Sequence, residues 1–549
     1  MDRAEAIRQL MAQHATLKAE QAQRLSYWQK RAEFTIPHKA AIASPLTPGA
    51  NAYREKYDAT GMLDATQFAA DLYTHMSPRG RWFILSPVAG SARERDRGYG
   101  RFLQERTERL HRALAGTNWD TEIHNAYEDL AMGTCCVAAK RHEANAFTLS
   151  TRPMGEYTFE VDEQGSPDTV FVERQLTAAQ AAKKWGLKKI DPELAENLSR
   201  LDPGAYTETR NYVNVCRPNE RWEPSGIVSR GYPYESLWIE AGKEPRLIQR
   251  GGTRRLRYVI SRFWRPTGMR WGMGPTDMAY GPIRCLDKAS EITLKYAAKA
   301  MDPPLIGPDD GSYHPLDSSP GTIIMARMGA TDRVKPGFLE LTADHRLAQF
   351  LFEYYGMQVA RAYMADVFRV LADRKQRTAK EVVTILEKSF DVAIPVHARI
   401  RMELFVPLIR LCLELLTEWE LGIRGWRYGG QALPEYEYEL DLVSPLALAI
   451  KYAELQSMSD LWVLNSRLAE VDPAVWDNYS LDEMSRAIGD NMGVPESWKR
   501  SVTEVRAIRE WRAQRLAEQQ ALEQAKLAAE TAEKLGRPAA PNSLLAEVA

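Results

Sequence analysis

The chain has 549 residues, of which 44% are hydrophobic and 26% charged, an ordinary globular composition that excludes wholesale disorder and a disulfide-stapled miniprotein. Its 72 Lys plus Arg residues nearly balance 73 Asp plus Glu residues, giving a net charge of -1. This balance excludes a protein that holds nucleic acid over its whole surface, so any contact with phosphates must be local.

The cysteines and the hydropathy of the chain exclude further classes of protein. The five cysteines form no C-x-x-C pair and no ligand spacing with histidine, so we expect neither a zinc site nor a disulfide framework. The N-terminus opens with Met1-Asp2-Arg3 and stays charged, without the apolar core of a signal peptide. The most apolar helical stretch, 404–416, contains Arg410 and Glu414 and is too short to span a bilayer. We expect a soluble chain of a reducing cytosol.

The first half of the chain mixes helices and strands. Apolar residues at helical spacing predict helices over 4–33, 65–76 and 101–114. Short β-favouring runs predict strands at 148–151, 157–161, 170–175, 212–216, 236–240 and 258–264. Strands and helices do not alternate regularly, so residues 1–270 are expected to form an α+β domain and not a doubly wound sheet.

The second half is mainly helical. A helix is expected over 277–301, ended by Asp302-Pro303-Pro304, because the residue before a proline is pushed out of the α region. Residues 302–342 contain strand-like runs at 322–328 and 337–341 among six prolines and predict a small β module. Two long helices follow in this prediction, over 343–371 and 378–419, the second kinked at Pro395 and Pro407.

From residue 444 onward we expect helices again, with breaks near Asp472-Pro473 and Gly493. The last helix, about 501–535, has only a narrow apolar seam, which fits packing against a neighbouring copy or a solvated terminal helix equally well. The seam comprises Val505, Ile508, Leu516, Leu522 and Leu527. Residues 536–549 are expected to be a loose tail.

No motif for catalysis or nucleotide binding is present. The sequence lacks G-x-x-x-x-G-K-[ST], H-E-x-x-H, G-x-S-x-G and a dinucleotide fingerprint. The glycine-rich run 268–275 fits no nucleotide motif, and we interpret it as a turn into the following helix. We therefore expect no enzyme: no catalytic residues, no metal and no cofactor. A Ser-His-Asp or two-carboxylate site assembled only in three dimensions stays open as an alternative.

Two basic features point to local contact with a polyanion. At 100° per residue, four basic residues of the helix over 277–301 lie within about 60° of arc and so share one face of this helix. Glu291 lies on the same face. These bases are Arg284, Lys288, Lys295 and Lys299. Pairing of Glu291 with Lys295 on a solvated face is the alternative explanation.

Residues 369–380 contain five basic residues and one acidic residue at a junction between two predicted helices. A solvated junction that contacts no polyanion is the alternative explanation for this second feature. The bases in the junction itself include Arg374, Lys375 and Arg377.

The order of these parts resembles the portal, or head-to-tail connector, proteins of short-tailed bacteriophages (the podovirus type). The similarity rests on short segments in a fixed order over about 390 residues, none of them catalytic. They are Tyr57-Asp58-Ala59-Thr60-Gly61, Phe68-Ala69-Ala70-Asp71-Leu72, Ser77-Pro78, Arg81-Trp82-Phe83, Asp129-Leu130-Ala131-Met132-Gly133-Thr134, Arg217-Pro218-Asn219, Gly272-Met273-Gly274-Pro275, Pro303-Pro304, Thr378-Ala379-Lys380-Glu381-Val382 and Ser444-Pro445-Leu446-Ala447.

The resemblance implies a mainly helical α+β subunit of a portal ring, typically of twelve copies. Its parts would be a wing, a two-helix stem, a small β clip, a tunnel loop and a helical crown. They would occupy 1–270 (wing), 271–301 (first stem helix), 302–342 (clip), 343–371 (second stem helix), 372–377 (tunnel loop), 378–443 (long wing helix and return) and 444–549 (crown with its loose tail).

The resemblance also implies a function without catalysis. The ring would sit at one capsid vertex of the virion, between capsid and tail, after assembly in the host cytoplasm. Double-stranded DNA would pass through it without sequence specificity during genome packaging and ejection. Arg374, Lys375 and Arg377 would face the DNA from the tunnel loop, and Arg284, Lys288, Lys295 and Lys299 from the channel wall.

The partners implied are a terminase large subunit, tail adaptor or nozzle proteins, and capsid and scaffolding proteins, with no membrane.

Two alternatives to the portal function come from other classes of protein. One is a phage internal virion enzyme whose site forms only on folding. The other is a helical adaptor without a channel.

Overall fold

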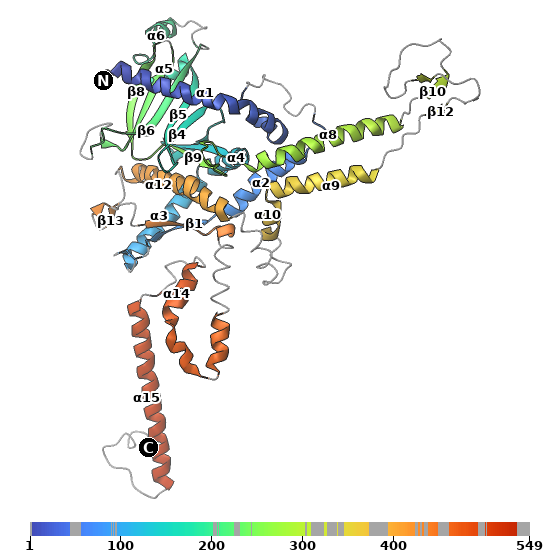
Figure 1. Cartoon of the computed structure of the whole chain (residues 1–549). Coiled ribbons are helices and arrows are strands. Elements are labelled where there is room, and N and C mark those ends of the chain that lie inside the picture. Colours follow the sequence, from blue (N-terminus) through green and yellow to red (C-terminus); the bar gives the residue numbers. More distant parts are fainter. Residues whose placement is uncertain are drawn as a thin grey trace. The chain divides into compact units, whose positions relative to one another are not determined.

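In the computed structural model the chain divides into two compact units. Figure 1 shows its helices and strands coloured along the sequence. Unit 1 comprises residues 1–84, 108–434 and 442–460, and unit 2 comprises 85–107, 435–441 and 461–549. The residues that the structure describes are 3–43, 56–88, 90–91, 93, 96–200, 206, 208–223, 231–242, 244–301, 305–308, 323–326, 337–338, 345–372, 394–422, 427–428, 431–432, 438–447, 461–470, 472–491, 500 and 502–534.

An antiparallel five-stranded sheet of unit 1 packs against the first helix. Its strands follow the order β4-β5-β6-β7-β8. They span Tyr157–Val161, Pro167–Thr177, Thr209–Pro218, Tyr234–Glu240 and Arg246–Thr253. Helix α1, Arg3–Thr35, buries Ile7, Leu10 and Leu17 against β5, β6 and β7, because these residues recur on one side of the helix. The predicted mixture of helices and strands is confirmed.

A second, three-stranded sheet has the order β3-β2-β9 and packs on helix α4, Trp119–Ala131. Its strands are Ala146–Thr151 (β3), Thr134–His142 (β2) and Tyr258–Arg262 (β9). Helix α2, Thr60–Met76, also packs on α4, and α3 spans Arg97–Ala115. Strands β2 and β8 and helix α4, together with the short helices α5 (Ala178–Trp185) and α6 (Pro192–Ser199), were not predicted.

The glycine-rich run 268–275 is a turn, as the sequence indicates. Its backbone lies directly on the turn before β2: a Cβ on Gly274 would be 2.2 Å from the carbonyl oxygen of Ala131. A Cβ on Gly133, whose φ is +113°, would be 2.6 Å from the carbonyl oxygen of Gly272. The Gly272 amide donates to Thr134 Oγ1 at 2.9 Å. Two of the segments that carry the family resemblance therefore pack backbone against backbone.

Helices α8 and α9 run side by side (Figure 1). Helix α8 spans Pro275–Met301 as predicted, and α9 spans His345–Ala362. The prediction of one continuous helix over 343–371 is wrong, because a separate helix, α10, covers Ala365–Ala372. The chain turns at Met364, which has a φ of +56°, and Tyr363 is buried there with its hydroxyl 2.9 Å from Thr276 Oγ1. The break lets α9 and α10 both pack on α2.

Between α8 and α9 the structure describes three short strands. They are β10 (Leu305–Pro308), β11 (Ile323–Ala326) and β12 (Gly337–Phe338). Strand β10 pairs in parallel with β11 and antiparallel with β12. The expected small β module is thus present in the described part of 302–342.

The predicted helix over 378–419 is described from residue 394 onward. Residues 394–400 are helical, Arg401–Phe405 form a π-helical turn, and α12 spans Val406–Leu421. The π turn lies directly before the predicted kink at Pro407, whose missing N–H disrupts the regular hydrogen-bond ladder. Two short strands follow, β13 (Arg427–Tyr428) and β14 (Gln431–Ala432).

The described part of unit 2 is mostly helical. It contains the pairing of β1 (Phe83–Pro87) with β15 (Tyr438–Leu442), where Ser86 Oγ donates to Asp441 at 2.6 Å. Helix α14 spans Leu481–Asn491 and α15 spans Val502–Lys534. The predicted break at Asp472-Pro473 is confirmed, since Asp472 caps a 3-10 helix over Pro473–Asn478. Gly493 and the tail 536–549 lie outside the described residues.

Candidate functional site on the paired helices

The first turn of α8 is anchored to α1 by a buried carboxylate. Asp277 accepts hydrogen bonds from the Tyr27 hydroxyl at 2.6 Å and the Gly274 amide at 3.1 Å. The guanidinium of Arg31 lies 2.9 Å from the same carboxylate. Burial, and then the bond to Asp277, raise the pKa of Tyr27 to about 12. This anchor fixes the start of α8 and hence the direction in which its basic face points.

Two of the four predicted channel-wall bases share one acid. Lys288 Nζ lies 2.8 Å and Lys295 Nζ 2.5 Å from the two carboxylate oxygens of Glu291. The bonds to Lys288 and Lys295 lower the pKa of Glu291 to about 2. The ion pair between Glu291 and Lys295, predicted from the sequence as the alternative explanation, is therefore present. Glu291 offsets one positive charge, and the four basic residues still lie on one face of α8.

The other two bases of the face sit in different surroundings. Arg284 is exposed, with its guanidinium 3.4 Å from the Tyr280 hydroxyl and 5.3 Å from the centre of the Phe34 ring. Lys299 is half-buried near the end of α8. The four bases thus form a stripe along α8 that carries a net positive charge after Glu291 is counted.

The outer halves of α8 and α9 form a two-helix arm without a core of its own. All buried residues of α8 lie in its first half, up to Leu286. In α9 the described side chains from 346 to 358 include no buried one. Instead, Leu347, Phe350, Tyr354 and Met357 are 48–59% exposed and recur at the spacing of a packing seam. Apolar residues at this spacing indicate a surface that a neighbouring helix covers.

The predicted basic junction is described only at its edge. Arg374, Lys375 and Arg377 lie outside the described residues. Arg369 is exposed on α10, where its charge acts on Asp64 and Asp71 of α2. This base of the junction therefore has acidic neighbours within the chain.

Helix α15 also exposes large apolar residues. Trp511, Leu516, Leu522 and Leu527 are 52–69% exposed along its length. An isolated helix of this composition is marginal in water, and these exposed residues fit packing against a neighbouring copy and a solvated terminal helix equally well.

Neither a metal cluster nor a membrane span is found in the part of the chain that the structure describes. There, no three His, Cys, Asp or Glu side chains gather closely enough to hold a metal ion. Among the same residues, no helix is both long and apolar enough to cross a membrane.

A mainly helical α+β subunit with an uncovered two-helix arm and a basic stripe belongs to the class of assembly proteins. The family model described as "Bacteriophage head to tail connecting protein" matches residues 7–498. The chain belongs to this family of structural proteins, and its role is that of a portal, which forms a ring at the head–tail junction of the phage particle.

Two curated relatives extend over nearly the whole chain. The "Probable portal protein" of Bordetella phage BPP-1 is 26% identical over 545 residues, covering 96% of this chain and 95% of the relative. The "Portal protein" of Salmonella phage epsilon15 is 22% identical over 548 residues, covering 96% and 94%. The family to which the sequence motifs point is thereby confirmed.

Proposed function

We propose that twelve copies of the chain close into a ring through the two-helix arms. The observation that carries this proposal is the arm formed by α8 and α9, which lacks a core and exposes an apolar seam. Identical subunits joined by heterologous contacts close into a ring when the rotation per subunit permits. In this assembly the seam of α9 packs against α8 of the next copy.

We further propose that double-stranded DNA passes through the ring during packaging and ejection. Duplex DNA carries one negative charge per ~1.7 Å, so a strongly basic wall would hold it in place. The stripe of Arg284, Lys288, Lys295 and Lys299 would guide it more weakly, because Glu291 shares the charge of two lysines. Such contacts are made to phosphates and carry no sequence specificity.

The same proposal assigns roles to the remaining segments. Residues 1–270 form the wing, 271–301 and 343–371 the stem, 302–342 the clip, 372–377 the tunnel loop, 378–443 the long wing helix and its return, and 444–549 the crown. Arg374, Lys375 and Arg377 contact phosphates from the tunnel loop. Removing these three charges together should impair DNA packaging or retention, and unchanged packaging and retention would exclude that role.

The ring contributes no catalysis of its own in this proposal. A terminase large subunit supplies the ATP-driven work while docked on the clip, and tail adaptor or nozzle proteins later replace it. Capsid and scaffolding proteins surround the wing, and the ring assembles in the host cytoplasm before entering the particle. Nuclease or ATPase activity of the purified chain would favour an internal virion enzyme instead.

The ring is tested by electron microscopy and native mass spectrometry of the purified protein. We expect rings with an axial hole wide enough for duplex DNA. The substitution Phe350→Lys, in the middle of the exposed seam, should shift the population to smaller species, because it places a charge in an apolar contact.

Gln349→Lys is the matched control. It adds the same charge to the neighbouring exposed position, about 100° around α9. Rings that survive both substitutions would rule out this seam as the contact between copies. A solid particle without an axial hole would support the non-channel adaptor.

A further inference from the structure

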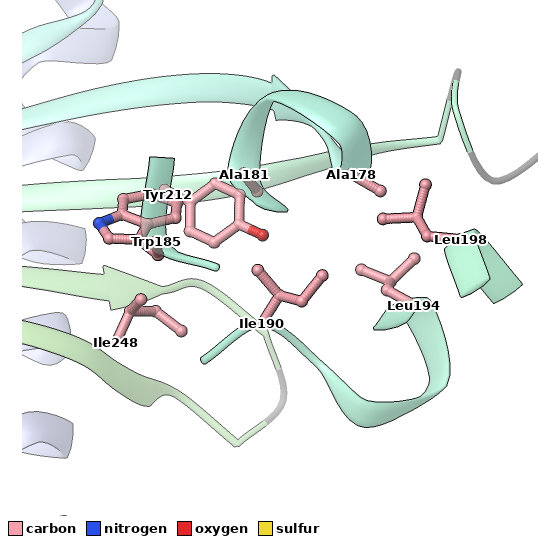
Figure 2. Close-up of a cluster of buried hydrophobic side chains, with 8 residues drawn as sticks. All are labelled: Ala178, Ala181, Trp185, Ile190, Leu194, Leu198, Tyr212 and Ile248. Carbon is pink, nitrogen blue, oxygen red and sulfur yellow. The ribbon is translucent and has the colours of Figure 1, made fainter. Parts of the chain in front are cut away.

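A cavity of about 510 Å³ lies in unit 1 between the end of α1, helix α4 and the loop after β3, and we call it the α1–α4 cavity. Its volume falls within the ~300–1,000 Å³ of pockets that enclose small ligands. The contact under α5 and α6, in contrast, is filled with side chains. Figure 2 shows Trp185 beside Tyr212, with Ile190, Leu194 and Leu198 continuing the same apolar cluster.

Part of the wall of the α1–α4 cavity is apolar. Ala32 and Ile36 come from the end of α1 and the residues after it, and Met132 and Met154 from the segments after α4 and β3. All four are buried. They would cover an aliphatic stem, because transfer of apolar surface out of water is favourable. Methionine adapts its shape to what it packs against, so this wall tolerates stems of different length.

Lys39 lies in the same wall with its ammonium group already saturated. Its Nζ donates to the carbonyl oxygen of Asn125 at 2.6 Å and to Asp129 Oδ1 at 2.9 Å. It also lies 3.0 Å from Glu128 Oε2. An ammonium group has three donors, so Lys39 keeps none for an anionic ligand. One ammonium is shared here between two carboxylates, which leaves an excess of negative charge.

Asp129 keeps one acceptor for a ligand. Asn125, Asp129 and Met132 all line the cavity, and their i, i+4, i+7 spacing places them on one face of the helical turns of α4. The side chain of Asp129 is 8% exposed. Lys39 occupies its Oδ1, and among the residues that the structure describes no donor reaches its Oδ2.

Glu156 adds a second carboxylate to the cavity wall. It is half-buried, and within the described part of the chain its carboxylate has neither a hydrogen bond nor an ion pair. Arg152 and Arg174 act on it only through their charge. Burial raises the pKa values of Glu156 and Asp129, because their charged forms are poorly solvated in this place. A bound cation would supply the missing solvation.

The chemistry of the wall selects the kind of cation. Among the described residues, no three His, Cys, Asp or Glu side chains gather closely enough to hold a metal ion. An organic ammonium group does not need a chelating set, since it directs three donors to separate acceptors. We propose that the α1–α4 cavity binds an alkylammonium group, carried by a free aliphatic amine or by a lysine side chain of a partner protein. The ammonium meets Asp129 and Glu156, and the stem lies on the apolar wall.

All residues of the cavity wall belong to one chain, so the test does not depend on ring closure. The full-length protein is titrated with pentylamine, whose stem and ammonium match a lysine side chain, and binding is followed by ligand-observed NMR. The salt concentration is about 0.15 M, where long-range attraction is largely screened. We expect saturable binding of one pentylamine per chain.

Glu156→Gln should weaken this binding about tenfold, the loss expected for one charged hydrogen bond. The fold should tolerate it, because the carboxylate has no partner within the described residues. Asp129→Asn should weaken binding as well. Its urea unfolding is measured alongside, because Asp129 also holds Lys39. Should Asp129→Asn fail to fold, Glu156→Gln still decides the question.

Glu163→Gln is the matched control, because it removes the same charge from an exposed turn outside the cavity wall. Competition by a blocked lysine amide would identify a lysine side chain of a partner as the source of the ammonium. Lack of competition would identify a free amine, and either result supports the site. Absence of saturable binding, equal weakening by Glu163→Gln, or equal competition by 1-pentanol, which lacks the charge, would overturn the proposal.

Discussion

At the scale of single residues, a buried ion pair links parts of the chain that are distant in sequence. Arg262 is 1% exposed, and its Nη2 lies 2.7 Å from Glu403, which also accepts from the Arg262 backbone amide at 2.9 Å. The pair ties β9 to the π-helical turn. No local pattern could reveal it, because 141 residues separate its members and each looks like an ordinary charged position.

Replacing Arg262 with Met should destabilise the protein strongly. The substitution leaves Glu403 largely buried without its partner, which costs about 3–5 kcal/mol. Urea unfolding measures the change in the free energy of unfolding. The double substitution Arg262→Met with Glu403→Leu should recover most of the loss, whereas equal losses in the single and double variants would contradict this account.

His397 should make stability depend on pH. Burial, and then the charge of Arg401, lower the pKa of His397 to about 4, below the ~6.5 of an unfolded chain. The unfolded state therefore binds more protons between these values, so stability is lost as pH falls from about 6.5 to about 4. His397→Leu should flatten this part of the urea stability curve, while His142→Gln, at an exposed position, should not. Parallel curves for wild type and His397→Leu would exclude the effect.

At the scale of elements, prediction succeeded where a pattern is long and failed where tertiary contacts decide. Helix α1 and helix α8 follow their apolar spacing closely. The break between α9 and α10 could not be predicted, because the stripe of apolar residues continues through it and only the burial of Tyr363 explains the turn. Strand β8 was missed because Gly251 and Gly252 weaken its β signal.

Gly274→Ala should be severely destabilising, because the added methyl group would meet backbone atoms that cannot move aside. We expect a loss of about 2–4 kcal/mol in the free energy of unfolding. Gly281→Ala is the control: nothing lies within 4 Å of its Cβ position, and alanine favours the helix. A mild effect of Gly274→Ala would mean that the two turns do not need their close backbone contact.

At the scale of the whole molecule, the proposed ring would bring the basic stripes of several copies around one axis. The basic stripe of α8 and the family could both be predicted from the sequence. The apolar residues of α9 look like an ordinary core stripe in the sequence, and only their exposure in the structure shows that they form an uncovered seam.

Charge on the stripe can be tested on the assembled ring. Glu291→Gln frees Lys288 and Lys295 from their shared acid in every copy, so DNA should bind more tightly and with a steeper dependence on salt. Fluorescence anisotropy with a labelled duplex should show an increase of about tenfold or more at low salt. Glu353→Gln is the control, because it removes one acidic charge from an exposed position of α9 that does not belong to the basic stripe. Unchanged binding by Glu291→Gln would mean that this face does not meet DNA.

The pairing of β1 with β15 has a consequence for the order of events during synthesis. Ser86 and its partner Asp441 are 355 residues apart in the chain. A ribosome adding 5–20 residues per second needs roughly 20 to 70 s to travel that distance. Throughout this interval β1 has left the ribosome without its partner strand, exposed to wrong pairing with other nascent chains. The final closure of this ladder must therefore be a late step, and a chaperone that shields residues 83–87 would raise the yield of folded subunits.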